Sequence, residues 1–378
     1  MALKAILTTV HSGFNYGSSL QALAGKTIIE KTGCICELVK LKSLVKGRDV
    51  RLRKLMAIFI RSIFLSQKTS LKAYRASYKK TFVSGTENLF FDFTDKYLQP
   101  LEVSWNRLKY MAQDSVACFS GSDQIWNSST MYMDPLYYLR FAPPYKRVAL
   151  SPSFGRDFIA DYNYKKMATW IREYPYLSIR EDSGVKLIKD LTGRDALHLL
   201  DPTLIVDAFQ WKRLLGIEEK SENYILAYFL DTPSDEAKLK LRELKRILQC
   251  EVVAIPYEFD NMDYCDKMLA AGPKEFVDLV SNAKVVCTDS FHGTAFAINL
   301  HIPFYSFERN YGSASKQSER VLSVLRKVHM IDRYQSHSSI SDWEKINFEY
   351  AERVLSKERE KAYSYVNNAV REIEKHEK

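Results

Sequence analysis

The sequence predicts an α/β fold with two Rossmann-like units whose parallel sheets face a common cleft. Short apolar segments alternate with helical segments along the chain, as in parallel sheets that are buried on both faces. The chain has 378 residues, 46% of them hydrophobic, which is enough for two cores of ordinary size. Polar residues follow several of the apolar segments, and folds of this class bind ligands at the carboxyl ends of their strands.

The first unit is expected to cover residues 1–206. It begins with a buried strand at 3–10, which a helix near 20–31 and a second strand at 35–41 follow. Four later strands run into polar residues, and we expect them within 115–127, 147–155, 176–182 and 196–203.

The second unit is expected over residues 207–347, because the composition turns polar near the start of this range. Its expected strands lie at 224–231, 251–256, 284–290 and 303–307. Helices are expected between these strands, at 234–248, 272–283, 293–300 and 317–328. The remaining residues, 348–378, predict a long charged helix that packs back on the first unit.

A basic segment interrupts the first unit, and we expect it to form a helical insertion over residues 40–82. Thirteen Lys and Arg residues and one acid, Asp49, give residues 40–80 a charge of +12. Since the whole chain carries +9, the remainder carries −3. Cations around the apolar run LMAIFIRSIFL (55–65) are typical of a helix on an anionic membrane surface. The alternative is a solvated helix with a core-facing stripe.

Other features of the sequence predict a cytoplasmic protein, either free or peripheral on the inner face of the membrane. The six cysteines form no CxxC pair and no Cys/His zinc spacing. The N-terminus lacks a signal peptide, and no run approaches the roughly 18–20 apolar residues of a spanning helix. Nucleic acid is not an expected partner, because no reader motif accompanies the basic segment. No metal is expected, because Asp260, Asp263 and Asp266 do not fit a calcium loop.

Arg180 is the first candidate binding residue, because an apolar strand places it directly before a helix. An arginine at a strand end can bind a carboxylate or phosphate through two parallel hydrogen bonds. The alternative is a structural salt bridge with Glu181 or Asp182.

A second candidate site lies where an apolar strand at 284–290 meets the helix at 293–300. The free N–H groups and the dipole of a helix N-terminus favour an anion there. Ser290 and Thr294 can donate hydroxyl hydrogen bonds, Gly293 allows close approach, and His292 can donate a proton near neutral pH. Alternatively, the residues before the helix only cap it, and His292 is a satisfied, partly buried histidine.

Further polar residues lie near other predicted strand and helix ends. Lys316 and Arg320 begin a helix and can meet the same anion, or they belong to a solvated helical turn. Asp123 and Gln124 can hold sugar hydroxyls, and Asp123 can act as a general base. The loop at 14–21 does not have the GxGxxG spacing of a dinucleotide site.

Six segments, taken in order, resemble the polysaccharide pyruvyl transferase family. They are NYGSSLQAL (15–23), GSDQIWN (121–127), SPSFG (151–155), LSIREDSG (177–184), LDPTL (200–204) and DSFHGTAFAINLHIPF (289–304). The resemblance implies a GT-B-like fold and transfer of a pyruvyl group from phosphoenolpyruvate to a sugar of a surface polysaccharide precursor, usually as a ketal. It implies phosphoenolpyruvate as a co-substrate and no cofactor. One departure is Ser290, because members of the family often have Arg at this position.

The resemblance and the residue chemistry together give the expected site. The catalytic residues are His292 as the acid and Asp123 or Asp289 as the base. The expected donor site consists of Arg180, Ser290, Gly293, Thr294, Lys316 and Arg320. The expected acceptor site consists of Asn15, Tyr16, Gly17, Gln21, Gln124 and Ser153. A lipid-linked saccharide is the expected acceptor, because the basic segment at 40–80 would hold the enzyme at the membrane that carries it.

Two other functions remain open at this point. One is a glycosyltransferase that uses a nucleotide-activated sugar in the same cleft, which the missing Arg at position 290 suggests. The other is a non-catalytic scaffold subunit of the polysaccharide assembly machinery.

Overall fold

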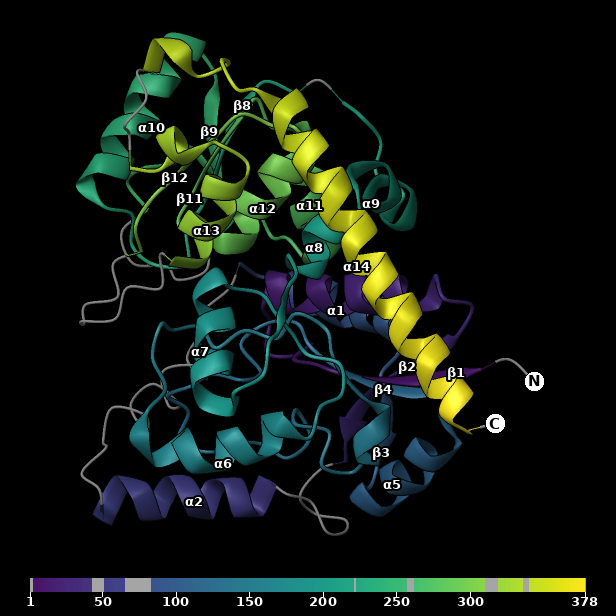
Figure 1. Ribbon diagram of the computed structural model, residues 1–378. Helices are drawn as coiled ribbons and strands as arrows, with labels where there is room; N and C mark the ends of the chain where they lie inside the picture. Colours follow the sequence, from purple (N-terminus) through teal and green to yellow (C-terminus); the bar gives the residue numbers. More distant parts are fainter. Residues whose placement is uncertain are drawn as a thin grey trace.

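The structure contains two five-stranded sheets, one in the lower and one in the upper half of Figure 1. It is a computed structural model that describes residues 3–42, 51–64, 83–220, 222–256, 262–309, 319–335 and 340–377. All strands in both sheets pair in parallel, and each unit has its first strand at the centre of its sheet. This is the strand order of a Rossmann-like unit, so the predicted α/β class is confirmed.

The first sheet is built from short buried strands. In spatial order they are β3 (Leu101–Val103), β2 (Ile35–Leu41), β1 (Lys4–Thr8), β4 (Ala117–Ser120) and β5 (Arg147–Ala149). Helix α1 (Tyr16–Glu30) covers one face, and α5 (Trp105–Asp114), α6 (Asp161–Arg172) and α7 (Asp182–Thr192) cover the other. A separate parallel pair, β6 (Ser178–Ile179) and β7 (Leu197–His198), lies beside β5.

The second sheet repeats this arrangement. Its strands are β10 (Lys267–Met268), β9 (Glu251–Ala254), β8 (Tyr224–Tyr228), β11 (Val285–Thr288) and β12 (Phe304–Ser306). Helix α10 (Asp235–Leu248) covers the outer face, while α11 (Pro273–Asn282) and α12 (Phe291–Asn299) cover the face toward the first unit. Helix α13 (Glu319–Lys327) follows β12 and contacts α12.

The two units share one continuous apolar core. Two short helices that follow β7 in sequence, α8 (Pro202–Ile205) and α9 (Ala208–Leu215), contribute to this core together with α1, α11 and α12. Tyr16 of α1 stacks on Phe276 of α11 at 5.2 Å between ring centroids, and Trp211 of α9 lies 5.1 Å from Phe296 of α12. The units are therefore packed against each other on the side where these helices lie.

The long C-terminal helix α14 (Phe348–Glu377) crosses both units (Figure 1). Nε of Arg359 donates to the carbonyl of Leu204 at 3.1 Å, and the hydroxyl of Tyr365 donates to the carbonyl of Ala149 at 2.8 Å. The predicted long helix is confirmed. The predicted unit boundary between residues 206 and 207 stays a prediction.

Within the predicted basic insertion over residues 40–82, residues 51–64 are helical, whereas residues 40 and 41 belong to β2. Helix α2 (Arg51–Phe64) lies beside α6 at the bottom of Figure 1, far from the second sheet. Residues 43–50 and 65–82 of the predicted insertion lie outside the described residues. No helix in the described ranges is both long enough and apolar enough to cross a membrane.

Most predicted strands and helices are confirmed, and the differences concern one helix start and several elements that were not predicted. Helix α1 begins at Tyr16 rather than near residue 20, because the side chain of Asn15 accepts a hydrogen bond from the backbone N–H of Ser18 at 3.1 Å and caps the helix there. The segment from α4 (Thr86–Phe93) to β3 and α5 had no predicted counterpart, and neither had α6, α9 and β10.

Asn299 of α12 is expected to be critical for joining α14 to the core. Its fully buried amide donates to the carbonyls of Thr203 and Val206 at 2.7 and 2.8 Å and accepts from Nη2 of Arg359 at 2.9 Å. Asn299→Ala should lower the free energy of unfolding by about 3 kcal/mol, because it leaves buried polar groups unpaired. Denaturant titration measures this loss. Asn106→Ala, at an exposed position on α5, is the control, and an equal effect of both substitutions would contradict the account.

Candidate active site

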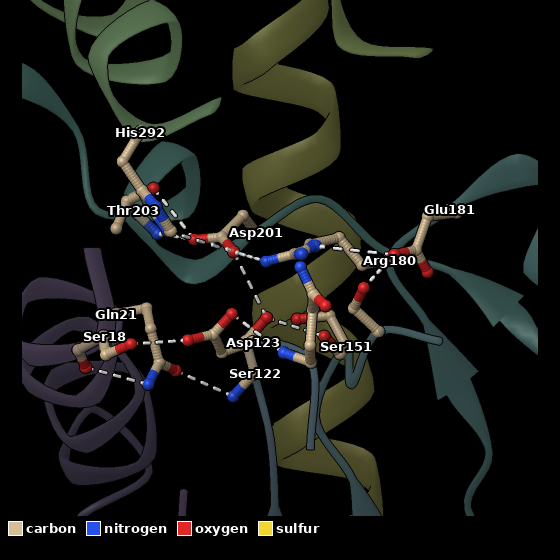
Figure 2. Close-up of polar contacts among 12 residues, drawn as sticks. Ser18, Gln21, Ser122, Asp123, Ser151, Arg180, Glu181, Asp201, Thr203 and His292 are labelled. Atoms are coloured by element: carbon tan, nitrogen blue, oxygen red, sulfur yellow. Dashed lines mark hydrogen bonds and ion pairs between the residues drawn. The ribbon is translucent and has the colours of Figure 1, made fainter. Parts of the chain in front are cut away.

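Charged and polar side chains from both units meet at a buried seam, which Figure 2 shows. Asp123 follows β4, Arg180 follows β6, and Asp201 follows β7. His292 reaches the seam from the first turn of α12 in the second unit. Because β4, β6 and β7 are parallel to their neighbours, their carboxyl ends bring Asp123, Arg180 and Asp201 together, as the sequence predicts for the ligand-binding edge.

A buried ion pair between Arg180 and Asp201 lies at the centre of this seam. Nη1 of Arg180 donates to Oδ2 of Asp201 at 2.6 Å. Oδ1 of Asp201 accepts from the backbone N–H and the hydroxyl of Thr203 at 3.0 and 2.8 Å, so Asp201 also caps α8. Burial opposes ionisation of Asp201, but the charge of Arg180 and the hydrogen bonds outweigh it and lower the pKa of Asp201. The pair is therefore ionised at neutral pH.

The other edge of the Arg180 guanidinium, formed by Nε and Nη2 and called its outer edge below, makes no hydrogen bond to the described residues. Its Nε and Nη2 atoms are buried and have no hydrogen-bond partner within the described part of the chain. Nε lies 4.0 Å from Oε1 of Glu181, and the guanidinium carbon lies 4.9 Å from the ring centroid of Phe291. Buried donors without partners are rare in folded proteins. Two such donors on one edge match the paired oxygens of a carboxylate or a phosphate.

His292 contacts the same ion pair from the second unit. Its Nε2 atom lies 3.9 Å from Oδ2 of Asp201, is buried, and has no hydrogen-bond partner among the described residues. Burial lowers the pKa of His292 and outweighs the attraction of Asp201 and Asp123. The imidazole is therefore neutral at pH 7 in the free protein, since its ordinary pKa is already about 6.5.

Gly17 in the first turn of α1 makes room for His292. A Cβ atom at this position would lie 1.9 Å from Nδ1 of His292, which is far inside van der Waals contact. Gly17 was predicted to contact the acceptor, and the structure places it against the imidazole instead.

Asp123 lies half-buried on the opposite side of the seam. Its Oδ2 atom accepts from the hydroxyl of Ser18 at 2.6 Å, and Oδ1 accepts from the backbone N–H of Gln124 at 2.8 Å. Burial alone would raise the pKa of Asp123, but the positive charge of Arg180 and the other partners lower it overall. Asp123 is therefore a carboxylate that a substrate hydroxyl could use as a base.

Arg320 of α13 completes the basic side of the seam. With its amide oxygen turned toward Arg320, Gln124 accepts from both Nη atoms at 3.0 Å. A cavity of about 10 Å³, room for one water molecule, is lined by Arg180, Asp201, Phe291 and Arg320 among others. Lys316, the other predicted cation, lies outside the described residues.

Asp289, a predicted catalytic residue, contacts a different part of the protein. Its two carboxylate oxygens accept from the backbone N–H groups of Leu230 and Asp231 at 2.7 and 3.2 Å, in the loop after β8. Burial raises the pKa of Asp289 to about 7, although those hydrogen bonds and Arg309 oppose the shift. In this position Asp289 anchors that loop, and no described contact joins it to His292.

The predicted donor residues of α12 make hydrogen bonds within the fold. Ser290 caps the helix, since its hydroxyl accepts from the N–H of Gly293 at 3.4 Å. The Thr294 hydroxyl donates to the carbonyl of Ser290 and pairs with the hydroxyl of Ser306. A Cβ atom on Gly293 would lie 2.4 Å from Oγ1 of Thr288, so glycine lets α12 approach β11 closely.

Three of the predicted acceptor residues are also bonded within the protein. The amide of Gln21 donates to the carbonyl of Val10 at 2.7 Å and accepts from the N–H of Ser122 at 2.9 Å. The hydroxyl of Tyr16 donates to the carbonyl of Ala271 at 2.9 Å, and that of Ser153 donates to Glu181. Their roles in acceptor binding stay predictions.

A cavity of about 660 Å³ lies in the first unit, near the carboxyl ends of β1 and β2 and the start of α1. Phe14, Phe90 and Phe91 supply aromatic walls, and His11 and Lys40 supply polar groups. Ser19 lines it, and the preceding residue, Ser18, contacts Asp123. The predicted acceptor residues are not among those that line the cavity in the described part of the chain.

Sequence reasoning gave no role to the residues that hold Arg180 in place. Asp201 stands at a predicted strand end, which marked it as polar and well placed, but its partner could not be identified without the fold. Ser122 donates to the carbonyl of Ser151 at 2.7 Å and to Oδ2 of Asp201 at 3.3 Å. No group of three or more potential metal ligands occurs among the residues that the structure describes.

The close contact between Gly17 and His292 can be tested by comparing alanine substitutions at two glycines of α1. Gly17→Ala should lower the melting temperature and weaken binding of anions at the seam, because its Cβ atom displaces the imidazole. Gly25→Ala is a matched control in α1, since its Cβ atom would lie 3.4 Å from Leu7 in ordinary contact. This control should be neutral or more stable by up to about 1 kcal/mol. Equal melting temperatures for the two variants would show that Gly17 and His292 are not in contact.

Solved structures similar to this chain share little of its sequence. The UDP-GlcNAc 2-epimerase from Neisseria meningitidis bound to UDP-GlcNAc is 10% identical, with 99% of each chain covered and a TM-score of 0.44. The E. coli heptosyltransferase WaaC with ADP-2-deoxy-2-fluoro heptose is 12% identical, with 83% of this chain and 91% of that chain covered and a TM-score of 0.38. Similarity with so little sequence identity and such low TM-scores does not indicate a function for this chain. No curated protein sequence matches the chain.

In contrast to the solved structures, a protein-family model matches the sequence over most of its length. The family model described as polysaccharide pyruvyl transferase matches residues 15–311, which is most of the chain. This range includes α1, β4, β6 and α12, the elements that bring side chains to the seam. The predicted resemblance is therefore confirmed, and the chain belongs to the polysaccharide pyruvyl transferase family.

Proposed function

We propose that the protein transfers the pyruvyl group of phosphoenolpyruvate to a sugar of a lipid-linked surface polysaccharide precursor and forms a ketal. The observation that carries this proposal is the buried outer edge of Arg180, with two unpartnered N–H donors next to His292. Membership of the family supports pyruvyl transfer. The donor and the acceptor are the parts that this proposal adds.

The donor anion would bind between the two units. Nε and Nη2 of Arg180 would hold two oxygens of its carboxylate or phosphate, and Arg320 would supply a second positive charge. The cavity of about 10 Å³ at this point is much smaller than phosphoenolpyruvate. Donor binding therefore requires the side chains of α12 and α13 to move away from Arg180.

The reaction can be written with groups that the seam provides. His292, protonated in the donor complex, would give its proton to C3 of phosphoenolpyruvate, which leaves a cationic centre at C2. The first sugar hydroxyl adds to C2 and loses its proton. Phosphate then leaves with the electrons of the C2–O bond, a second hydroxyl adds to C2, and phosphate takes up that proton. The products are the ketal and inorganic phosphate.

Asp123 is the proposed base for the first hydroxyl. Its pKa is lowered by Arg180 against the effect of burial, so the carboxylate is available at neutral pH. Asp289 is the less suitable base, because both of its oxygens already accept backbone hydrogen bonds in another loop. Asp201 is occupied by Arg180 and Thr203.

The cavity of about 660 Å³ is the proposed place for the acceptor sugar. Its volume suits one or two sugar rings, and its aromatic walls at Phe14, Phe90 and Phe91 offer apolar faces to a ring. Ser19 lines the cavity, and the hydroxyl of the neighbouring Ser18 donates to Asp123. A sugar that extends from the cavity along the start of α1 would therefore approach the proposed base.

Ser290 replaces the arginine that family members often have, and its place in the structure suggests why this is tolerated. The side chain of Ser290 caps α12 instead of reaching into the seam. The guanidinium carbon of Arg320 lies 5.8 Å from the ring centroid of Phe291, the residue next to Ser290, so Arg320 could supply the missing positive charge.

Phosphate release tests the donor and the role of His292 together. We expect phosphoenolpyruvate to raise the melting temperature and to release phosphate when a suitable lipid-linked sugar is added. His292→Asn should slow phosphate release by at least about 100-fold, because it removes the proton donor. Arg180→Lys should weaken donor binding by roughly tenfold or more, because lysine cannot form the paired hydrogen bonds.

Two controls separate this function from its alternatives. His301→Asn, at an exposed histidine, should leave phosphate release unchanged. A melting-temperature rise with a nucleotide sugar and none with phosphoenolpyruvate would contradict the proposal and favour a glycosyltransferase. Binding of neither donor would favour a non-catalytic subunit.

Proton uptake tests the ionisation of His292. Burial lowers the pKa of the free imidazole, so His292 is neutral at pH 7.5, and a bound anion should raise its pKa and draw in a proton. Calorimetry of phosphoenolpyruvate binding in buffers with different ionisation enthalpies should therefore show proton uptake at pH 7.5. The His292→Asn variant should take up no proton. Equal uptake by both proteins would assign the proton to another group.

A further inference from the structure

Helix α2 exposes its apolar side to solvent. Six large apolar side chains are between 39% and 62% exposed, namely Leu52, Leu55, Met56, Phe59, Ile60 and Ile63. They recur at intervals of three and four residues, so at about 100° per residue they fall within an arc of about 140° on one side of the helix. We refer to these six residues as the apolar stripe of α2.

The opposite side of α2 faces the protein. Ile58 and Ser62 are buried there, and the guanidinium of Arg61 lies 5.2 Å from the ring centroid of Tyr162 on α6. A helix on the surface of a globular protein normally turns its large apolar residues inward. In α2 the orientation is reversed, so the core of this protein does not explain the apolar stripe.

The charge of α2 fits an anionic surface. Between residues 51 and 64 the sequence has three Arg and one Lys and no acid, and no acid follows until Glu87. Arg53 is exposed and adjoins the apolar stripe. An apolar side bordered by an exposed cation, on a helix without acidic residues, is typical of a helix that lies in the headgroup region of a membrane.

We propose that α2 docks this protein onto an anionic membrane, with the apolar stripe among the acyl chains and the flanking cations at the lipid headgroups. The helix is about 21 Å long, so it lies in the membrane surface and does not cross it. The position of α2, beside α6 and far from the second sheet, leaves the second unit away from the membrane (Figure 1). This inference stands on α2 alone and does not depend on the identity of the donor.

Vesicle flotation of the full-length protein tests the proposal. We expect binding to vesicles of phosphatidylcholine mixed with phosphatidylglycerol, and much weaker binding to phosphatidylcholine alone. The double variant Phe59→Ser/Ile63→Ser should bind at least about tenfold more weakly, because two exposed apolar anchors are lost. High salt should also reduce binding, because it screens the attraction of the cations to the lipids.

A matched control removes apolar surface elsewhere. Phe209→Ser/Leu239→Ser changes two side chains that are similarly exposed on α9 and α10, and it should bind vesicles like the parent protein. All three proteins should have equal melting temperatures, since none of the substituted residues is buried. If both double variants lose binding equally, the apolar stripe is not the docking surface.

Two other results would overturn the proposal. Equal binding to neutral and anionic vesicles would remove the role of charge. Light scattering distinguishes a second copy of the chain as the occupant: a parent protein that is dimeric and ignores vesicles, together with a monomeric Phe59→Ser/Ile63→Ser variant, would show that the apolar stripe is a dimer interface.

Discussion

The buried ion pair between Arg180 and Asp201 determines how the rest of the site is arranged. Two charges inside a protein are costly unless their remaining hydrogen-bonding atoms are also satisfied. Asp201 meets this requirement with Thr203, Ser122 and Arg180, and in doing so it caps α8 between the two units. Arg180 meets it on one edge only. Its other edge is held rigidly by the same pair and points its donors toward the space between Glu181 and Phe291.

The apolar core that the two units share fixes the position of His292 relative to Arg180 and Asp201. Helices α1, α8, α11 and α12 pack in one apolar layer, so His292 reaches Asp201 from the second unit without a mobile connection. Gly17 allows that approach, because any side chain there would occupy the place of the imidazole. A donor that binds at this seam would contact both units, so that its binding and their relative position would be coupled.

Much of this could be predicted from the sequence, and the exceptions have physical causes. Apolar strands with polar ends predicted the two sheets and placed Arg180 and Asp123 of the first unit, and His292 of the second, at strand ends that face a common cleft. The structure brings these three residues together. Sequence proximity suggested that Asp289 would act with His292, but neighbouring side chains at a strand end point in different directions, and Asp289 bonds to the loop after β8. Partners such as Asp201 come from distant segments, so only the fold reveals them. The outward orientation of the apolar stripe was likewise open, because the pattern fits either side.

The central claim is that the Nε and Nη2 donors of Arg180 bind the donor anion. Selective ¹⁵N labelling of arginine allows the Nε–H signal of Arg180 to be assigned by comparison with Arg180→Lys and followed by NMR. If the account is correct, phosphoenolpyruvate shifts this signal strongly downfield, because the buried N–H gains a charged acceptor. An Arg180 signal that stays in place while phosphoenolpyruvate saturates the protein would contradict it, since the anion would then bind elsewhere.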